Sequence, residues 1–186
     1  MSRMAELDTL VHHVLPQVLP CPRSMVLDAL QATTADFFAK AGVWVESWEE
    51  VVPAGLPEVE LTPPQGTEIA RVKSVSIGGQ VLDKSAWSLD YRTVNLGAAT
   101  GSGECLVCVE AVLRPSRFAG KLPLRFMEEW GDVLVQGALA RIKSMSGKGI
   151  EWTDEQGAAL ALALYNQGAA SARIRAVRRS SNVFGS

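Results

Sequence analysis

The chain has 186 residues, of which 47% are hydrophobic and 20% are charged, and its formal net charge is −2. This composition excludes an intrinsically disordered chain, a coiled-coil rod and a disulfide-dense secreted scaffold. No apolar run reaches the roughly 18 residues that a membrane span needs, and the N-terminus lacks the apolar stretch of a signal peptide. We therefore expect a soluble protein without a membrane segment, not exported by a standard signal, whose three cysteines are reduced thiols.

The near-neutral total conceals an uneven distribution of charge. Residues 1–70 contain 10 acidic and 3 basic side chains, a net charge of −7, whereas residues 71–186 contain 10 and 15, a net charge of +5. No acidic residue follows Glu155. A chain that is acidic at one end and basic at the other can attract copies of itself or bind a charged partner.

The first part of the chain predicts two helices joined by a tight proline turn. Apolar residues recur at helical spacing over residues 7–18, but Pro16 and Pro20 limit this helix, which we expect to end near Val14. Pro22 suits the start of a second helix, which runs to about Lys40. Gly42 is placed to end that helix with a left-handed cap.

The middle of the chain predicts a small antiparallel β lobe. After Gly42 the apolar period changes from about 3.6 to 2, in short runs separated by Pro and Gly. Gly78-Gly79 lies between two such runs and predicts a two-residue hairpin. The lobe closes at Pro115.

The remaining residues predict two further helices and a polar tail. Pro123 opens the third helix, and Thr153 begins a capping box, with Gln156 reaching back, that starts an alanine-rich fourth helix. The order of elements indicates an α+β fold, namely a four-helix bundle with an inserted small antiparallel β lobe and an extended C-terminal arm. The predicted segments are residues 1–42 (helices one and two), 43–115 (β lobe), 116–178 (helices three and four) and 179–186 (C-terminal docking arm).

Several motifs that superficially indicate chemistry have a simpler interpretation. Cys105 and Cys108 have C-x-x-C spacing, but residues three apart on a strand point to opposite faces, so a metal or redox centre is the minor alternative. His12 and His13 diverge by about 100° on a helix and cannot chelate one ion together. The glycine-rich segments lack the strand–loop–helix context of a phosphate loop. We therefore expect no catalytic residue, no metal and no cofactor, and predict that the protein is not an enzyme.

The end of the last predicted helix is the candidate binding site. Arginines gather there after an acid-free stretch, and an aromatic residue follows them. The residues expected to dock a partner are Arg173, Arg175, Arg178, Arg179, Val183 and Phe184. A solvated helix end, favoured by the helix dipole, is the alternative interpretation of these arginines. The five tryptophans most simply serve as packing residues.

Short segments in a fixed order carry a resemblance to a known family. These segments are Leu19-Pro20-Cys21-Pro22 with a helix ending near Val43-Trp44, Pro63 to Ile69 entering Val72 to Gly79, Leu113 to Ser116, Leu122 to Phe126, and Gly137 to Ile142. Over roughly residues 5–180 the chain resembles the head-to-tail adaptors of tailed bacteriophages, the group of the tail tubular protein A type and related head-completion connectors.

The resemblance implies a structural virion protein made in the host cytoplasm and located at the head–tail interface. It implies a ring, typically of twelve copies, that joins the portal protein to tail or nozzle proteins. Viral double-stranded DNA would pass through the lumen without sequence recognition. The channel would retain the packaged DNA and later let it be ejected. The C-terminal arm would reach the portal. The chain departs from the family between Val94 and Gly103, where a longer hairpin is often seen.

A second interpretation does not depend on the resemblance. The basic C-terminal helix also fits a small nucleic-acid-binding or regulatory protein. Such a protein would bind duplex DNA with an affinity that falls steeply as salt rises.

Overall fold

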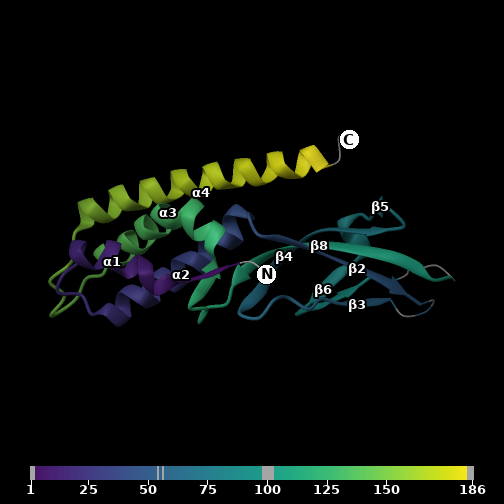
Figure 1. The fold of residues 1–186 in the computed structure, drawn as a ribbon, viewed down its shortest axis with the longest axis horizontal. Helices are drawn as coiled ribbons and strands as arrows, with labels where there is room; N and C mark the ends of the chain where they lie inside the picture. The colour runs from purple at the N-terminus through teal and green to yellow at the C-terminus, as the bar shows by residue number, and fades with distance from the viewer. Residues whose placement is uncertain (1–2, 54, 56, 98–102, 184–186) are drawn as a thin grey trace. The chain divides into compact units, whose positions relative to one another are not determined.

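The computed structural model describes residues 3–53, 55, 57–97 and 103–183, with only the backbone described for 179–183. Its contacts divide the chain into two compact units, a helical unit (residues 1–43 and 115–186) and a β unit (residues 44–114) (Figure 1). The helices are α1 (Val11–Val14), α2 (Arg23–Ala41), α3 (Leu124–Lys143) and α4 (Glu155–Val183). The strands are β1 (Met4–Glu6), β2 (Val45–Val52), β3 (Glu58–Glu60), β4 (Thr67–Ile77), β5 (Gln80–Val81), β6 (Ser88–Asp90), β7 (Thr93–Asn95), β8 (Cys105–Pro115) and β9 (Lys121–Pro123).

Three long helices form the core of the helical unit. Pro22 precedes α2, and Gly42 ends it in the left-handed conformation with φ 65°, as the sequence predicted. Helix α3 packs against both α2 and α4. The largest fully buried side chains of this unit are Leu7, Val11, Val14, Leu30, Phe37, Phe38, Leu122, Leu134 and Ile142.

The prediction of a four-helix bundle is wrong, because α1 has only four residues. It is flanked by two 3₁₀ turns, Leu7–Leu10 and Leu15–Gln17, and Pro16 lies at the start of the second turn. Proline has no N–H to donate to a helical ladder, so the segment cannot extend as a regular α-helix. Its apolar residues are still buried, so the periodicity identified a core segment without fixing its length. The structure is a mixed α and β fold.

A short strand pair in the helical unit escaped the sequence prediction. Strand β1 pairs antiparallel with β9, and Met4 lies opposite Pro123. Backbone hydrogen bonds from Leu7 to Gly120 and from Leu124 to Arg3 extend this pairing on both sides. The start of the chain is thereby attached to the segment that leads into α3.

The β unit contains two sheets with the strand orders β2-β8-β4-β5 and β3-β7-β6. Gly78 and Gly79 join β4 to β5 with φ values of 56° and 84°, the hairpin that the sequence predicted. One core cluster fills this unit, formed by Val52, Val59, Leu61, Val75, Val94, Leu96, Val107 and Val109.

The prediction of an extended C-terminal arm is also wrong for the part of the arm that the structure describes. Helix α4 continues to Val183, so residues 179–183 are helical rather than extended, and residues 184–186 lie outside the described part of the chain. Neither proline nor glycine occurs between Gly168 and Gly185, so nothing in the sequence breaks the helix at Arg178.

The hydrogen bonds at the start of α4 differ from those of the predicted capping box. Asp154, one residue later than predicted, accepts a hydrogen bond from the Gly157 N–H at 2.9 Å. The Thr153 hydroxyl instead donates to the Met145 carbonyl. The hydrogen bond from Gly157 lowers the pKa of Asp154, and the contact with Lys143 lowers it further.

None of the helices in the described part of the chain is both long enough and apolar enough to cross a bilayer.

Candidate functional site

Helix α4 carries most of the predicted docking residues and has two different faces. Its 29 residues extend about 43 Å. One face, the inner face, is buried against α3 and consists mainly of small side chains. Its buried residues are Ala158, Ala161, Tyr165 and Ala172.

Small residues let the helices of this unit approach closely. A Cβ atom at Gly137 of α3 would lie 2.3 Å from Thr33 Cγ2 and 2.7 Å from the Tyr165 ring. A Cβ atom at Gly168 of α4 would lie 2.5 Å from Val133 Cγ2. Both distances are shorter than any ordinary carbon contact, so each position requires glycine for this packing.

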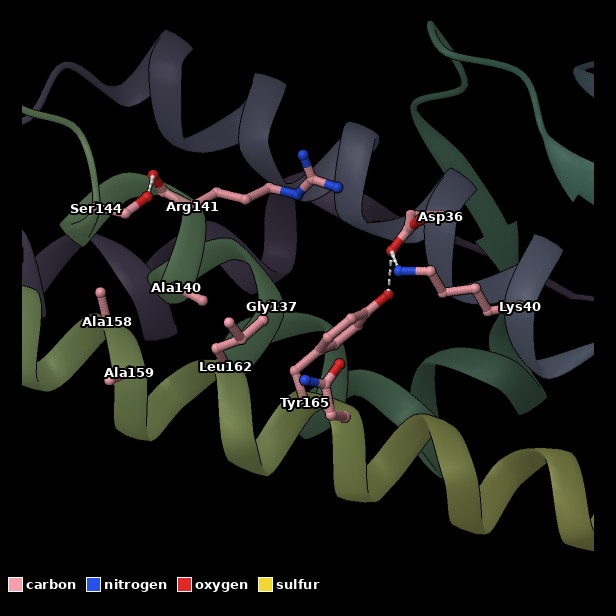
Figure 2. Close-up of a pocket in the computed structure, with 11 residues that line it drawn as sticks. Asp36, Lys40, Gly137, Ala140, Arg141, Ser144, Ala158, Ala159, Leu162 and Tyr165 are labelled. Carbon is pink, nitrogen blue, oxygen red and sulfur yellow. Dashed lines mark hydrogen bonds and ion pairs between the residues drawn. The ribbon is translucent and has the colours of Figure 1, made fainter.

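A polar cluster beside Gly137 links α2 to α4 (Figure 2). The Tyr165 hydroxyl donates to Asp36 Oδ2 at 2.7 Å, and Lys40 Nζ donates to the same oxygen at 2.8 Å. Burial raises the pKa of Asp36, but the hydrogen bonds from Lys40 and Tyr165 outweigh it and leave this pKa below its ordinary value. Burial raises the pKa of Tyr165, and the hydrogen bond to Asp36 raises it further.

This cluster lines a cavity of about 260 Å³ between the three long helices. Arg141 of α3 extends toward the cluster, and its charge also lowers the pKa of Asp36 (Figure 2). A tyrosine with a raised pKa stays protonated and is a poor acid, and a carboxylate held by two donors is a poor proton acceptor. The arrangement therefore acts as a polar clamp between helices and does not provide a general acid and base.

We predict that Tyr165→Phe lowers the free energy of unfolding by about 1–2 kcal/mol at pH 7, because a half-buried carboxylate loses a hydrogen-bond donor. The pKa of Asp36 is lower in the folded than in the unfolded chain, so its stabilisation is present above the unfolded pKa and is lost as the pH falls. The difference between Tyr165→Phe and the unchanged protein should accordingly shrink below about pH 4.

Urea unfolding at pH 7 and at pH 3 checks this prediction. The Tyr91→Phe variant is the control, since Tyr91 is 80% exposed and its change should stay within about 0.5 kcal/mol. A difference between Tyr165→Phe and the unchanged protein that is the same at both pH values would contradict the role given to Asp36.

The structure divides the predicted docking residues into three groups. Arg175 is bound within its own unit, because it contacts Glu129 at 3.4 Å and lies 5.3 Å from the centre of the Trp130 ring. Arg173 and Arg178 are exposed, and no ion pair among the described side chains involves either of them. For the third group, only the backbone of Arg179 and Val183 is described, and Phe184 lies outside the described residues.

The outer face of α4 exposes large apolar side chains that the sequence reasoning did not identify. Leu160 is 64% exposed, Leu164 43%, Ile174 56% and Val177 60%. With the exposed Ala163 and Ala170 between them, these residues lie along one side of the helix over about 26 Å, in two groups separated by the exposed Gln167. We call these six residues the outer stripe. Apolar residues on both sides of one helix were the signal in the sequence that could have revealed it.

No family model and no curated protein matches the chain in a significant alignment.

The other motifs lie apart from α4. Cys105 packs against the core of the β unit, whereas the Cys108 thiol lies near Ser76 and Glu49. His12 and His13 are adjacent and exposed on α1. Among the described residues, no group of three His, Cys, Asp or Glu side chains is arranged to hold a metal ion.

Proposed function

We propose that this protein is a structural virion component, a head-to-tail adaptor that assembles as a ring between the portal and the tail. The copy number of twelve comes from the resemblance to that family. The observation that supports the proposal most is the outer stripe of α4. A monomeric protein rarely leaves four large apolar side chains in water along one side of a helix, and such a surface is typical of a protein that assembles. Arg173 and Arg178 add positive charge beside the stripe.

The contacts with other components follow from the same helix. The C-terminal end of α4 docks on the portal protein as a helix, with Arg178 and Arg179 supplying the charge. Tail or nozzle proteins bind elsewhere on the ring. Double-stranded DNA passes through the lumen without sequence recognition, which suits a near-neutral chain because every phosphate contact would add affinity and hinder sliding.

The experiment measures binding to the portal protein encoded in the same genome. We expect deletion of residues 178–186 to weaken portal binding at least tenfold, because the variant lacks Arg178, Arg179 and the end of the docking helix. The helical unit should remain folded, since Arg178 is exposed and the last buried residue among the described side chains of α4 is Ala172. Cosedimentation with portal rings gives the affinity, and circular dichroism reports the helix content.

A charge-matched control separates docking from general electrostatics. Arg117→Ala combined with Lys148→Ala likewise removes two positive charges from the helical unit, and it should bind the portal as the unchanged chain does. Arg117 and Lys148 are both exposed. Undiminished binding by the truncated chain would rule out docking through the end of α4. Absence of rings in electron micrographs of portal mixtures would count against the adaptor itself.

The nucleic-acid-binding alternative rests on the exposed Arg173 and Arg178. Ile174 and Val177 lie among these arginines, and apolar side chains gain nothing from phosphate contacts. The adaptor proposal therefore expects little affinity of the isolated chain for duplex DNA. Tight binding at 50 mM salt that falls steeply by 200 mM would favour the alternative.

A further inference from the structure

The two units carry opposite charges, which the division of the chain at residue 70 had concealed. The β unit contains 10 acidic and 5 basic side chains, a net charge of −5, and the helical unit contains 10 and 13, a net charge of +3. In the helical unit, α4 has arginines at its C-terminal end and only Glu155 as an acid. A basic surface in one unit and an acidic surface in the other are complementary between copies.

The β unit also exposes an apolar patch, on the face of its four-stranded sheet away from the core. Val51 of β2 lies opposite Leu106 of β8 in the strand register, and the two are 59% and 49% exposed. Their neighbours in sequence, Val52 and Val107, are buried in the core on the other face.

A third exposed residue extends this patch across the sheet. The Cys108 thiol, two residues beyond Leu106 and therefore on the same face, is hydrogen-bonded with Ser76 of β4. Val81 of β5 lies opposite Ser76 and is 63% exposed. We call Val51, Val81 and Leu106 the sheet patch. Glu49, two residues before Val51 on β2, gives this face an exposed carboxylate.

We infer that the outer stripe of α4 in one copy packs on the sheet patch of a second copy. Each surface alone leaves large apolar side chains in water, and their contact removes both sets from it. The contact also brings Arg173 and Arg178 to the unit with the net charge of −5. Charge favours a contact between the stripe and the patch over a contact between two stripes. Packing the α4 helices of two copies on each other would bring two arginine-rich helices together.

The inference rests on the assembly proposed above and identifies the surfaces of its lateral contact. The stripe and the patch are different surfaces, so each copy can bind one neighbour through its stripe and a second neighbour through its patch. Such heterologous contacts generate a ring when the rotation between copies closes.

The test uses two full-length variants that each lack one surface. Ile174→Glu places a charge in the outer stripe and leaves the sheet patch intact, whereas Leu106→Glu does the reverse. Both side chains are about half exposed, so the introduced carboxylates are not buried in the folded monomer. Sedimentation velocity and light scattering from about 1 to 100 μM measure the masses, without any portal present.

We expect the unchanged chain to form species larger than a dimer as its concentration rises, and each variant alone to remain a monomer. An equimolar mixture of the two variants should form a one-to-one heterodimer, because the intact stripe of one fits the intact patch of the other and growth then stops. Formation of the heterodimer also shows that both variants are folded. Phe118→Glu is the control, since Phe118 is 85% exposed and lies outside both surfaces, and it should assemble as the unchanged chain does.

Four outcomes would overturn the inference. These are an unchanged chain that is monomeric at every concentration, a Leu106→Glu variant that still associates, a mixture without heterodimer, and a Phe118→Glu control that dissociates. Loss of portal binding in the truncated chain is measured separately, so failure here leaves the portal contact standing.

Discussion

Phe37→Ala is expected to destabilise the helical unit by about 3–5 kcal/mol. Phe37 has no exposed surface and lies on α2 at the centre of an aromatic cluster. Its ring centre is 5.4 Å from that of Phe38 in an edge-to-face arrangement and 5.6 Å from that of Trp130 on α3. The substitution removes the buried ring, its contacts on both helices and the aromatic pairing itself.

Guanidinium chloride unfolding, with hydrogen exchange to assign the transition to amides of α2 and α3, measures this effect. The control is Phe118→Ala, which removes the same atoms from an 85% exposed position and should change the free energy of unfolding by no more than about 0.5 kcal/mol. A loss below about 1.5 kcal/mol in Phe37→Ala would mean that the cluster collapses around the missing ring, and that it is not the centre of the core.

Local signals in the sequence were sufficient where one residue type decides the backbone. Gly42 ends α2 at φ 65°, and Gly78-Gly79 makes the β4–β5 hairpin at two positive φ values, because side-chain-free residues adopt these conformations at little cost. The change of apolar period after Gly42 likewise marked the start of the β strands.

Signals that depend on distant residues were missed. The β1–β9 pair joins Met4 to Pro123, and a three-residue strand is too short to show a period. The end of α1 at Val14 was predictable from Pro16, but nothing in the sequence showed that Leu7–Leu10 forms a 3₁₀ turn instead of the first turn of that helix. The charged and polar residues after Arg178 predict a tail, although they are also compatible with the helix that continues to Val183.

The candidate site was likewise predictable from the sequence only where local signals were sufficient. The acid-free, arginine-rich end of α4 was visible in the sequence, but the engagement of Arg175 by Glu129 required the packing of α4 on α3. The Asp36–Tyr165 hydrogen bond joins residues 129 positions apart, and neither belongs to a recognisable motif. The charge imbalance is visible along the sequence, yet its physical boundary is between the two units and not at residue 70.

Gly137→Ala is expected to destabilise the helical unit by about 1–2 kcal/mol, although alanine is the better helix former by about 1 kcal/mol. The new methyl group would lie 2.3 Å from Thr33 Cγ2 and 2.7 Å from the Tyr165 ring. Thr33 and Tyr165 are 1% and 4% exposed, so neither can move away into solvent. Overpacking of a buried contact costs about 1–3 kcal/mol or more, which outweighs the gain in helix propensity.

Gly131→Ala provides the matched control on the same helix. Gly131 is also buried within α3, but a Cβ atom there would meet its nearest neighbour, Leu10 Cδ2, at an ordinary 3.5 Å. This substitution should therefore stabilise the unit by up to about 1 kcal/mol, so that the two alanine variants differ by about 1–3 kcal/mol and have opposite signs. Urea unfolding of both variants measures the difference, and equal effects would contradict the close approach of α2 and α4 at Gly137.

A double-mutant cycle then identifies the atoms responsible. Thr33→Ser removes the methyl group that lies 2.3 Å from the new Cβ, so Gly137→Ala should cost less in the Thr33→Ser background than in the unchanged protein. The relief should be partial, because the Tyr165 ring remains at 2.7 Å. If the cost of Gly137→Ala is the same in both backgrounds, Thr33 yields freely and the Tyr165 ring alone requires glycine at position 137.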